Sequence, residues 1–212
     1  MAYEYGSPSR PIREILTVLR DDLARTYRAE YLPAHRRSPR KSRRLRRIRG
    51  WSRHLSRLVA DIDRVMDVVL PRIERETGHT FRDHDGIVRV LMSPSTERLF
   101  LGILGDIPED ALNVPARDLA ILAHSLKDAR ALAIIGDVTL QLKVMHGEHP
   151  MKFASLADRW GLHENRIGLS SHYRPTGETL MQEKEALARA TLGLIYIEGG
   201  ADALRAAVPL LS

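Results

Sequence analysis

The chain has 212 residues, enough for one good-sized domain or for one domain with an appendage. It contains no cysteine, which excludes disulfides and zinc–thiolate sites, and only 5% of its residues are aromatic, which argues against a stacking platform for single-stranded nucleic acid. No apolar run approaches the length of a membrane span and nothing resembles a signal peptide, so we expect a cytoplasmic protein without a membrane partner.

Two amphipathic helices are predicted at the start of the chain. Apolar residues recur at helical spacing from Pro11 until the pattern fades near Tyr31. A second such pattern starts at Trp51 and ends at Pro71. We therefore expect a helical hairpin, which forms an N-terminal extension of residues 1–71.

A basic arm connects the two predicted helices. The net charge is +6, from 33 basic and 27 acidic residues, and nine of the basic residues lie within 36–49, where no acidic residue occurs. The rest of the chain then carries 24 basic and 27 acidic residues, or −3. Mutual repulsion predicts an arm that is extended or disordered alone and orders on RNA. The predicted phosphate contacts are Arg36, Arg37, Arg40, Lys41, Arg43, Arg44, Arg46, Arg47 and Arg49.

The main domain is predicted to span residues 72–212 and to be all-α. Gly78 is placed to end a short helix, and Asp83 or Asp85 to begin the next. His124 is interpreted as a core histidine. Further helices are expected over residues 96–104, 115–123, 128–145, 154–160, 179–197 and 201–210.

A single carboxylate, Asp137, interrupts the apolar stretch Leu132–Leu140. A buried carboxylate is unfavourable unless it is paired, hydrogen-bonded or bound to a metal. The neighbouring Gly136 favours close approach of another backbone. Small residues at Ala186, Ala190 and Gly193 predict that the helix 179–197 makes this approach, and Gly199 or Gly200 is expected to end that helix in a left-handed conformation.

Three segments together resemble the ribonuclease III family. Leu132–Leu140 resembles its signature helix, and Ala133 matches the compact "Mini" branch of the family. The segment 189–200 resembles the second signature, and 73–91 resembles the opening of the domain. The resemblance implies the ribonuclease III endonuclease fold, a homodimer, and cleavage of structured, double-stranded RNA by Mg²⁺ or Mn²⁺ that carboxylates of two packed helices hold.

The family's carboxylate set is incomplete here. Asp137 matches the family aspartate, whereas four other acidic positions of the family fall on Arg130, Ala133, Ala186 and Arg189. Glu185, one helical turn before Arg189, is the candidate second catalytic and metal-binding residue, with Glu183 and Asp128 as further candidates. Two readings stay open. Either Asp137 and Glu185 hold metal in an endoribonuclease, or Asp137 pairs with an arginine in a non-catalytic RNA-binding or ribosome-associated scaffold.

Two other functions are weighed against these readings. The segment 153–167 has the outline of a helix-turn-helix of a DNA-binding regulator, but no clean second helix follows it. His84-Asp85, with His79 or His54 and Asp137, would suit an HD-type phosphohydrolase, although an acidic helix cap explains the dipeptide more simply. The segment His146–His149 is interpreted as a loop.

Overall fold

The computed structural model describes residues 8–34, 39–143, 152–169 and 176–211, and these are all-α, as predicted. The helices are α1 (Ile12–Ala34), α2 (Pro39–Arg64), η1 (Val65–Val69), α3 (Leu70–Thr77), α4 (His84–Leu91), α5 (Ser95–Asp106), η2 (Glu109–Ala111), α6 (Ala116–Lys143), α7 (Phe153–Trp160), α8 (Gly177–Ala207) and η3 (Val208–Leu211). The described residues form no strand, only an isolated bridge between Met92 and Ile167. None of the helices so described is long and apolar enough to cross a membrane.

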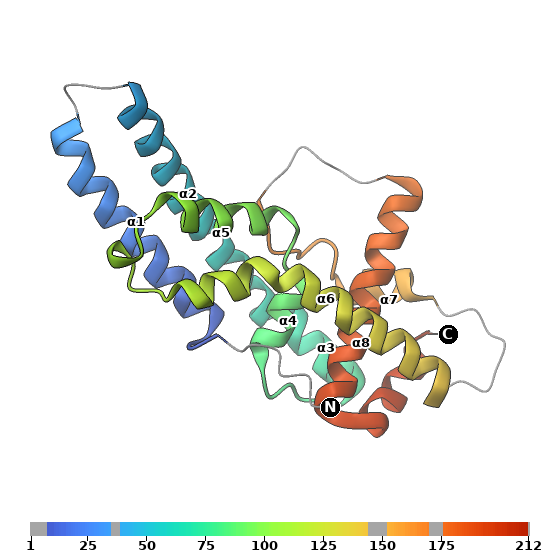
Figure 1. Cartoon of the computed structure of the whole chain (residues 1–212). Helices are drawn as coiled ribbons and strands as arrows, with labels where there is room; N and C mark the ends of the chain where they lie inside the picture. The colour runs from blue at the N-terminus through green and yellow to red at the C-terminus, as the bar shows by residue number, and fades with distance from the viewer. Residues whose placement is uncertain (1–7, 35–38, 144–151, 170–175, 212) are drawn as a thin grey trace.

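The N-terminal hairpin is longer than predicted, because the basic arm is largely helical. α1 and α2 lie side by side and extend away from the other helices (Figure 1). The expectation of an extended or disordered arm is wrong for residues 39–49, which form the first turns of α2. Leu45 and Ile48 continue the buried apolar stripe of α2, and arginine is itself a good helix former. Arg36 and Arg37 lie outside the described residues.

The sequence predicted that the second helix ends at Pro71, but the helical path continues through this residue. A π-helical turn, η1, joins α2 to α3, and the Leu70 N–H donates to the Val65 carbonyl five residues earlier. A wider turn of this kind accommodates a proline ring that would clash with the carbonyl four residues before it. The division into 1–71 and 72–212 stays a prediction, since the helical rod runs across it and one apolar core includes both parts.

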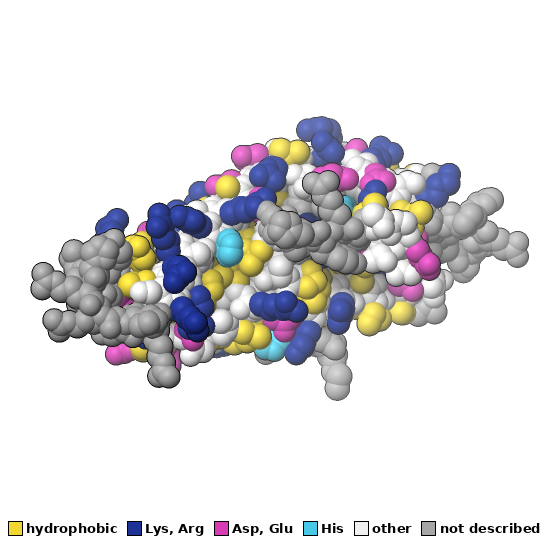
Figure 2. Space-filling view, turned by 90° about the horizontal axis from the view of Figure 1, so that it is seen from above, with side chains coloured by type: hydrophobic (Ala, Val, Ile, Leu, Met, Phe, Trp, Pro, Cys, Tyr) yellow, Lys and Arg dark blue, Asp and Glu magenta, His cyan; other side chains and the backbone are white. Residues whose placement is uncertain are grey.

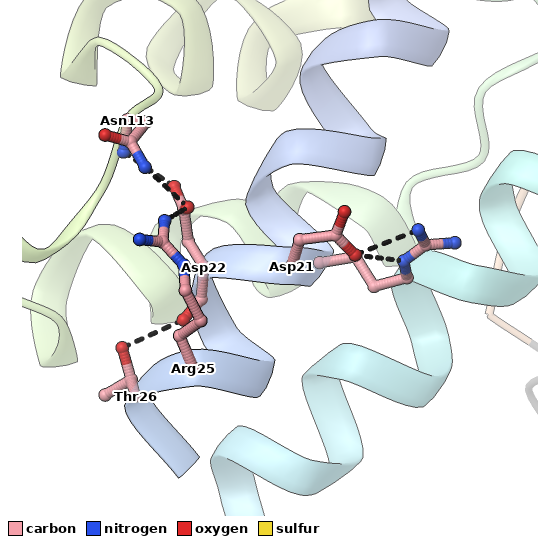
Figure 3. Close-up of polar contacts among 6 residues, drawn as sticks. Asp21, Asp22, Arg25, Thr26 and Asn113 are labelled. Carbon is pink, nitrogen blue, oxygen red and sulfur yellow. Dashed lines mark hydrogen bonds and ion pairs between the residues drawn. The ribbon is translucent and has the colours of Figure 1, made fainter. Parts of the chain in front are cut away.

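Asp22 ties α1 to the segment that precedes α6. Its carboxylate is 1% exposed and accepts bonds from the backbone N–H of Asn113, at 2.6 Å, and from Asn113 Nδ2, at 2.8 Å (Figure 3). Arg25 also pairs with it. The neighbouring Asp21 points away and pairs with Arg20 instead. α1 is therefore fixed to the body by a buried polar contact as well as by its apolar face.

Several local predictions are confirmed, and two of the predicted helices are one continuous helix. Gly78 ends α3 with a φ of 68°, and the Asp83 side chain accepts the Asp85 N–H at the start of α4. The helices predicted over 115–123 and 128–145 are one helix, α6, in which the Ser125 hydroxyl donates to the Leu122 carbonyl. The predicted break at Gly200 is confirmed: the backbone there is non-helical, with a φ of 74°, and it divides α8 into two helical parts across a kink.

Candidate functional site

The centre of the main body is the crossing of α6 and α8, where two glycines bring the backbones together (Figure 1). A Cβ on Gly136 would collide with the Arg189 carbonyl oxygen, and one on Gly193 would collide with the Leu132 carbonyl oxygen. The close approach predicted from these residues is confirmed. Ala190 is buried at the crossing side of α8, but Ala186 is exposed and does not belong to the buried small-residue face.

Beside this crossing, the side chain of Arg189 lies between two carboxylates. Its Nε is 3.3 Å from Asp137 Oδ1 on α6, and its Nη2 donates to Glu185 Oε2 at 3.0 Å on α8. The guanidinium also covers the Phe153 ring of α7 at 4.4 Å from the ring centre. All three charged side chains are about one third exposed. The two predicted metal ligands are therefore brought together, with an arginine as their shared partner.

The other predicted carboxylates lie in separate environments. Glu183 pairs with Arg166 at 2.7 Å and is 3.6 Å from His163. Burial raises the pKa of Asp128, against the opposing influence of Arg89 and His124. Across the described ranges, no group of three or more His, Cys, Asp or Glu residues is arranged to hold a metal ion. The assignment of Asp137 and Glu185 as catalytic metal ligands stays a prediction.

A second candidate site is the basic face of α2, which we define as Arg43, Arg46, Arg47, Arg49 and Arg53. All five side chains are exposed. Figure 2 shows basic side chains gathered on the left of the molecule, the end that α1 and α2 form in Figure 1. Arg53 was missed by the sequence analysis, although its helical spacing from Arg46 places it on the same side of α2.

The arginines of α2 differ in their partners. Arg44 faces α1 and pairs with Glu30 at 3.0 Å, and Arg47 pairs with Asp106 at 2.7 Å. Within the described part of the chain, Arg43, Arg49 and Arg53 form no ion pair. Of the remaining predicted contacts, Arg40 and Lys41 belong to the α2 backbone, but their side chains are not described. The basic face thus offers several guanidinium groups that are not neutralised by the described residues.

The residues that would serve an HD-type phosphohydrolase or a helix-turn-helix regulator lie apart from one another or have structural roles. Asp85 accepts the Ile12 N–H at 3.0 Å and so fixes the start of α1, while His54 lies on α2 and His79 lies 3.8 Å from Glu198. α7 ends at Gly161 with a φ of 67°, and no second helix follows up to residue 169. His124, expected in the core, is exposed and contacts the Ala120 carbonyl at 2.7 Å. His146–His149 lies outside the described residues.

Comparisons with protein-family models, with curated proteins and with solved structures found no match for this chain. The structure defines an all-α protein with a tightly crossed helix pair and a basic helical hairpin. The resemblance to ribonuclease III, with the homodimer and the Mg²⁺ or Mn²⁺ that it implies, stays a prediction.

Proposed function

We propose that this protein binds structured RNA through the basic face of α2 and does not cleave it. The observation that carries the proposal is the position of Arg189, whose guanidinium contacts both Asp137 and Glu185. The ribonuclease III resemblance selects Asp137 for metal binding, and Glu185 is the candidate second ligand because it lies one helical turn before Arg189. The arginine supplies the positive charge that a divalent metal would otherwise supply.

The electrostatics of this cluster oppose metal binding. A cation next to a metal position repels Mg²⁺, which requires several oxygen ligands in near-ideal octahedral geometry. Arg189 is also held by the Phe153 ring, so its displacement would break three contacts together. Asp137 further accepts a bond from Gln141 Nε2 at 3.2 Å. The four contacts favour a structural ion pair over a hydrolytic centre.

The basic face supports binding to an RNA backbone. From Arg43 to Arg53 it follows ten residues of helix, about 15 Å at 1.5 Å per residue. A-form RNA is recognised mostly by its shape and its phosphates, to which arginine donates in a bidentate manner. The Trp51 ring lies next to the Arg47 guanidinium and to Gly102 of α5. This aromatic ring of α2 therefore contacts an arginine of the basic face. This arrangement suits a duplex backbone better than stacked single-stranded bases.

The test measures cleavage and binding of a labelled RNA duplex in the same samples. With Mg²⁺ or Mn²⁺, we expect no metal-dependent cutting by the wild type or by Asp137→Asn, and binding that weakens steeply as salt rises. A triple variant of the basic face, Arg43→Gln, Arg46→Gln and Arg49→Gln, should bind markedly more weakly. Its matched control replaces three exposed arginines of α3, α5 and α6, Arg75, Arg98 and Arg117, with glutamine.

Two outcomes would contradict the proposal. Metal-dependent cutting that Asp137→Asn abolishes would show an active endoribonuclease, with Asp137 and Glu185 as its metal ligands. Equal weakening of binding by the two triple variants would show that total charge, and not the face of α2, attracts the RNA.

A further inference from the structure

The first turns of the basic face border an open depression of about 530 Å³, which Arg43, Arg46 and Arg47 line. We infer that this depression is a phosphate-binding site, in which the three arginines together hold one phosphate group of the RNA. This inference rests on the proposed function and makes it more specific: three arginines of the basic face bind one phosphate group.

Three arginines line the depression and one carboxylate, Asp106, pairs with Arg47 beside it, so the net charge there favours an anion. Arg43 and Arg46 form no ion pair with the described residues, and Arg46 Nε donates only to the Ser42 carbonyl, at 3.4 Å. Arg43 lies three residues from Arg46 and four from Arg47, so the three side chains emerge on one side of the helix. Like charges at this spacing destabilise a helix, and a bound phosphate relieves their repulsion.

Arg47 is the pre-positioned member of the set. Its Nη1 lies 2.7 Å from Asp106 at the end of α5, and its guanidinium lies over the Trp51 ring at 5.9 Å. The Trp51 ring packs beside Gly102 of α5, where an added Cβ would lie 3.4 Å from it. An arginine held by a carboxylate and an aromatic ring loses less side-chain freedom when it binds an anion. The Arg47 side chain is still 57% exposed, so a phosphate can reach the guanidinium beside Asp106.

The first measurement uses tripolyphosphate as the probe and tryptophan fluorescence as the signal. The chain has two tryptophans, and Trp160 is fully buried against Glu76, so a change on binding reports Trp51. We expect saturable binding by the wild type, weakened about tenfold by Arg43→Gln and by Arg47→Gln. Arg44→Gln is the matched control: Arg44 lies on the same helix but pairs with Glu30 and does not line the depression. Its affinity should stay within about twofold of the wild type.

Arg43→Gln should leave α2 folded, because Arg43 is exposed and forms no ion pair with the described residues. Equal weakening by Arg43→Gln and Arg44→Gln, with unchanged circular dichroism, would overturn the phosphate site. Duplexes with a 5′-phosphate and with a 5′-hydroxyl then distinguish the source of the phosphate. Equal affinity assigns the site to the RNA backbone, and a clear preference for the 5′-phosphate assigns it to an RNA end; either result supports the site if Arg43→Gln weakens the binding.

The failures of the two proposals are distinguishable. If the duplex binds and Arg43→Gln and Arg47→Gln leave its affinity unchanged, the phosphate site is wrong while RNA binding stands. If tripolyphosphate binds at Arg43 and Arg47 but no RNA duplex binds, the proposed function is wrong and the anion site stands.

Discussion

Gly136 and Gly193 face each other where α6 crosses α8, so closely that a Cβ on Gly136 would lie 2.9 Å from the Gly193 nitrogen. The obstruction in each case includes backbone of the opposite helix, which cannot rotate away as a side chain can. The spacing of α6 and α8 is therefore set by two residues without side chains. The same spacing places Arg189 within reach of Asp137.

Gly136→Ala and Gly193→Ala should each destabilise the protein, by about 1–3 kcal/mol, because the added methyl group forces two packed helices apart. The measurement is urea unfolding followed by circular dichroism. Gly50→Ala is the control: Gly50 also lies inside a helix, and nothing lies within 4 Å of its Cβ position. That change should stabilise the protein by about 0.5–1 kcal/mol. Unchanged stability in both crossing variants would contradict the close helix contact.

Arg189→Glu should convert the ion-pair cluster into a metal site. It places a third carboxylate beside Asp137 and Glu185, so repulsion should lower the Tm in the absence of metal. Mn²⁺ at ten times its dissociation constant would then add about 1.4 kcal/mol of stability. Thermal unfolding with and without Mn²⁺ measures the effect, with Arg189→Gln as the control that should not respond. A wild-type protein stabilised by Mn²⁺ as strongly as Arg189→Glu would argue that the metal binds elsewhere.

Asp22→Ala should destabilise the protein by about 1–3 kcal/mol, because it removes the buried carboxylate that accepts the Asn113 backbone N–H and side-chain amide. Asp21→Ala, one residue earlier, is the matched control. Asp21 is 60% exposed and pairs with Arg20 on the surface, so its loss should change stability by less than about 0.5 kcal/mol. Denaturant unfolding of the two variants measures the difference, and equal effects would contradict the assigned role of Asp22 as the anchor of α1.

Asp85 should make folding less favourable as the pH rises. Burial raises the pKa of its carboxyl, against the lowering effect of the bond from the Ile12 N–H. A raised pKa in the folded state means that this group favours folding below the ordinary carboxyl pKa of about 4 and that the benefit is lost as the pH rises through the folded value. Asp85→Asn keeps an oxygen acceptor for Ile12 but cannot ionise. Its unfolding free energy should therefore fall less between acidic and neutral pH than that of the wild type.

Asp63 should have the opposite effect on the pH dependence of stability, because its pKa is lowered and that of Asp85 is raised. Its hydrogen bond from Arg13, at 2.5 Å, lowers the pKa of the Asp63 carboxyl. Its contribution to stability is therefore present above the ordinary carboxyl pKa and is lost as the pH falls through the lowered value. Asp63→Asn should remove some stability at neutral pH and little at acidic pH. If Asp63→Asn and Asp85→Asn shift the pH profile in the same direction, the assignment for Asp85 is wrong.

Local rules, read from the sequence, determined much of this fold. The apolar spacing of the first helix, the left-handed Gly78 and the Asp83 cap each depend on residues within one or two turns, and the structure has all three. The glycines of the α6–α8 crossing were also recognisable, because a glycine inside a helix is unfavourable unless something approaches it. For these features the information lies in neighbouring residues.

Only the tertiary structure decided what those rules left open. The repulsion of the basic arm favoured an extended segment, but the burial of Leu45 and Ile48 outweighs it, and residues 39–49 are helical. Asp137 had several possible partners, and only the crossing of α6 and α8 selects Arg189 for it, together with Glu185. The physical reason is that a charge pairs with whatever the fold brings within about 4 Å, and sequence spacing fixes that distance only within a single helix.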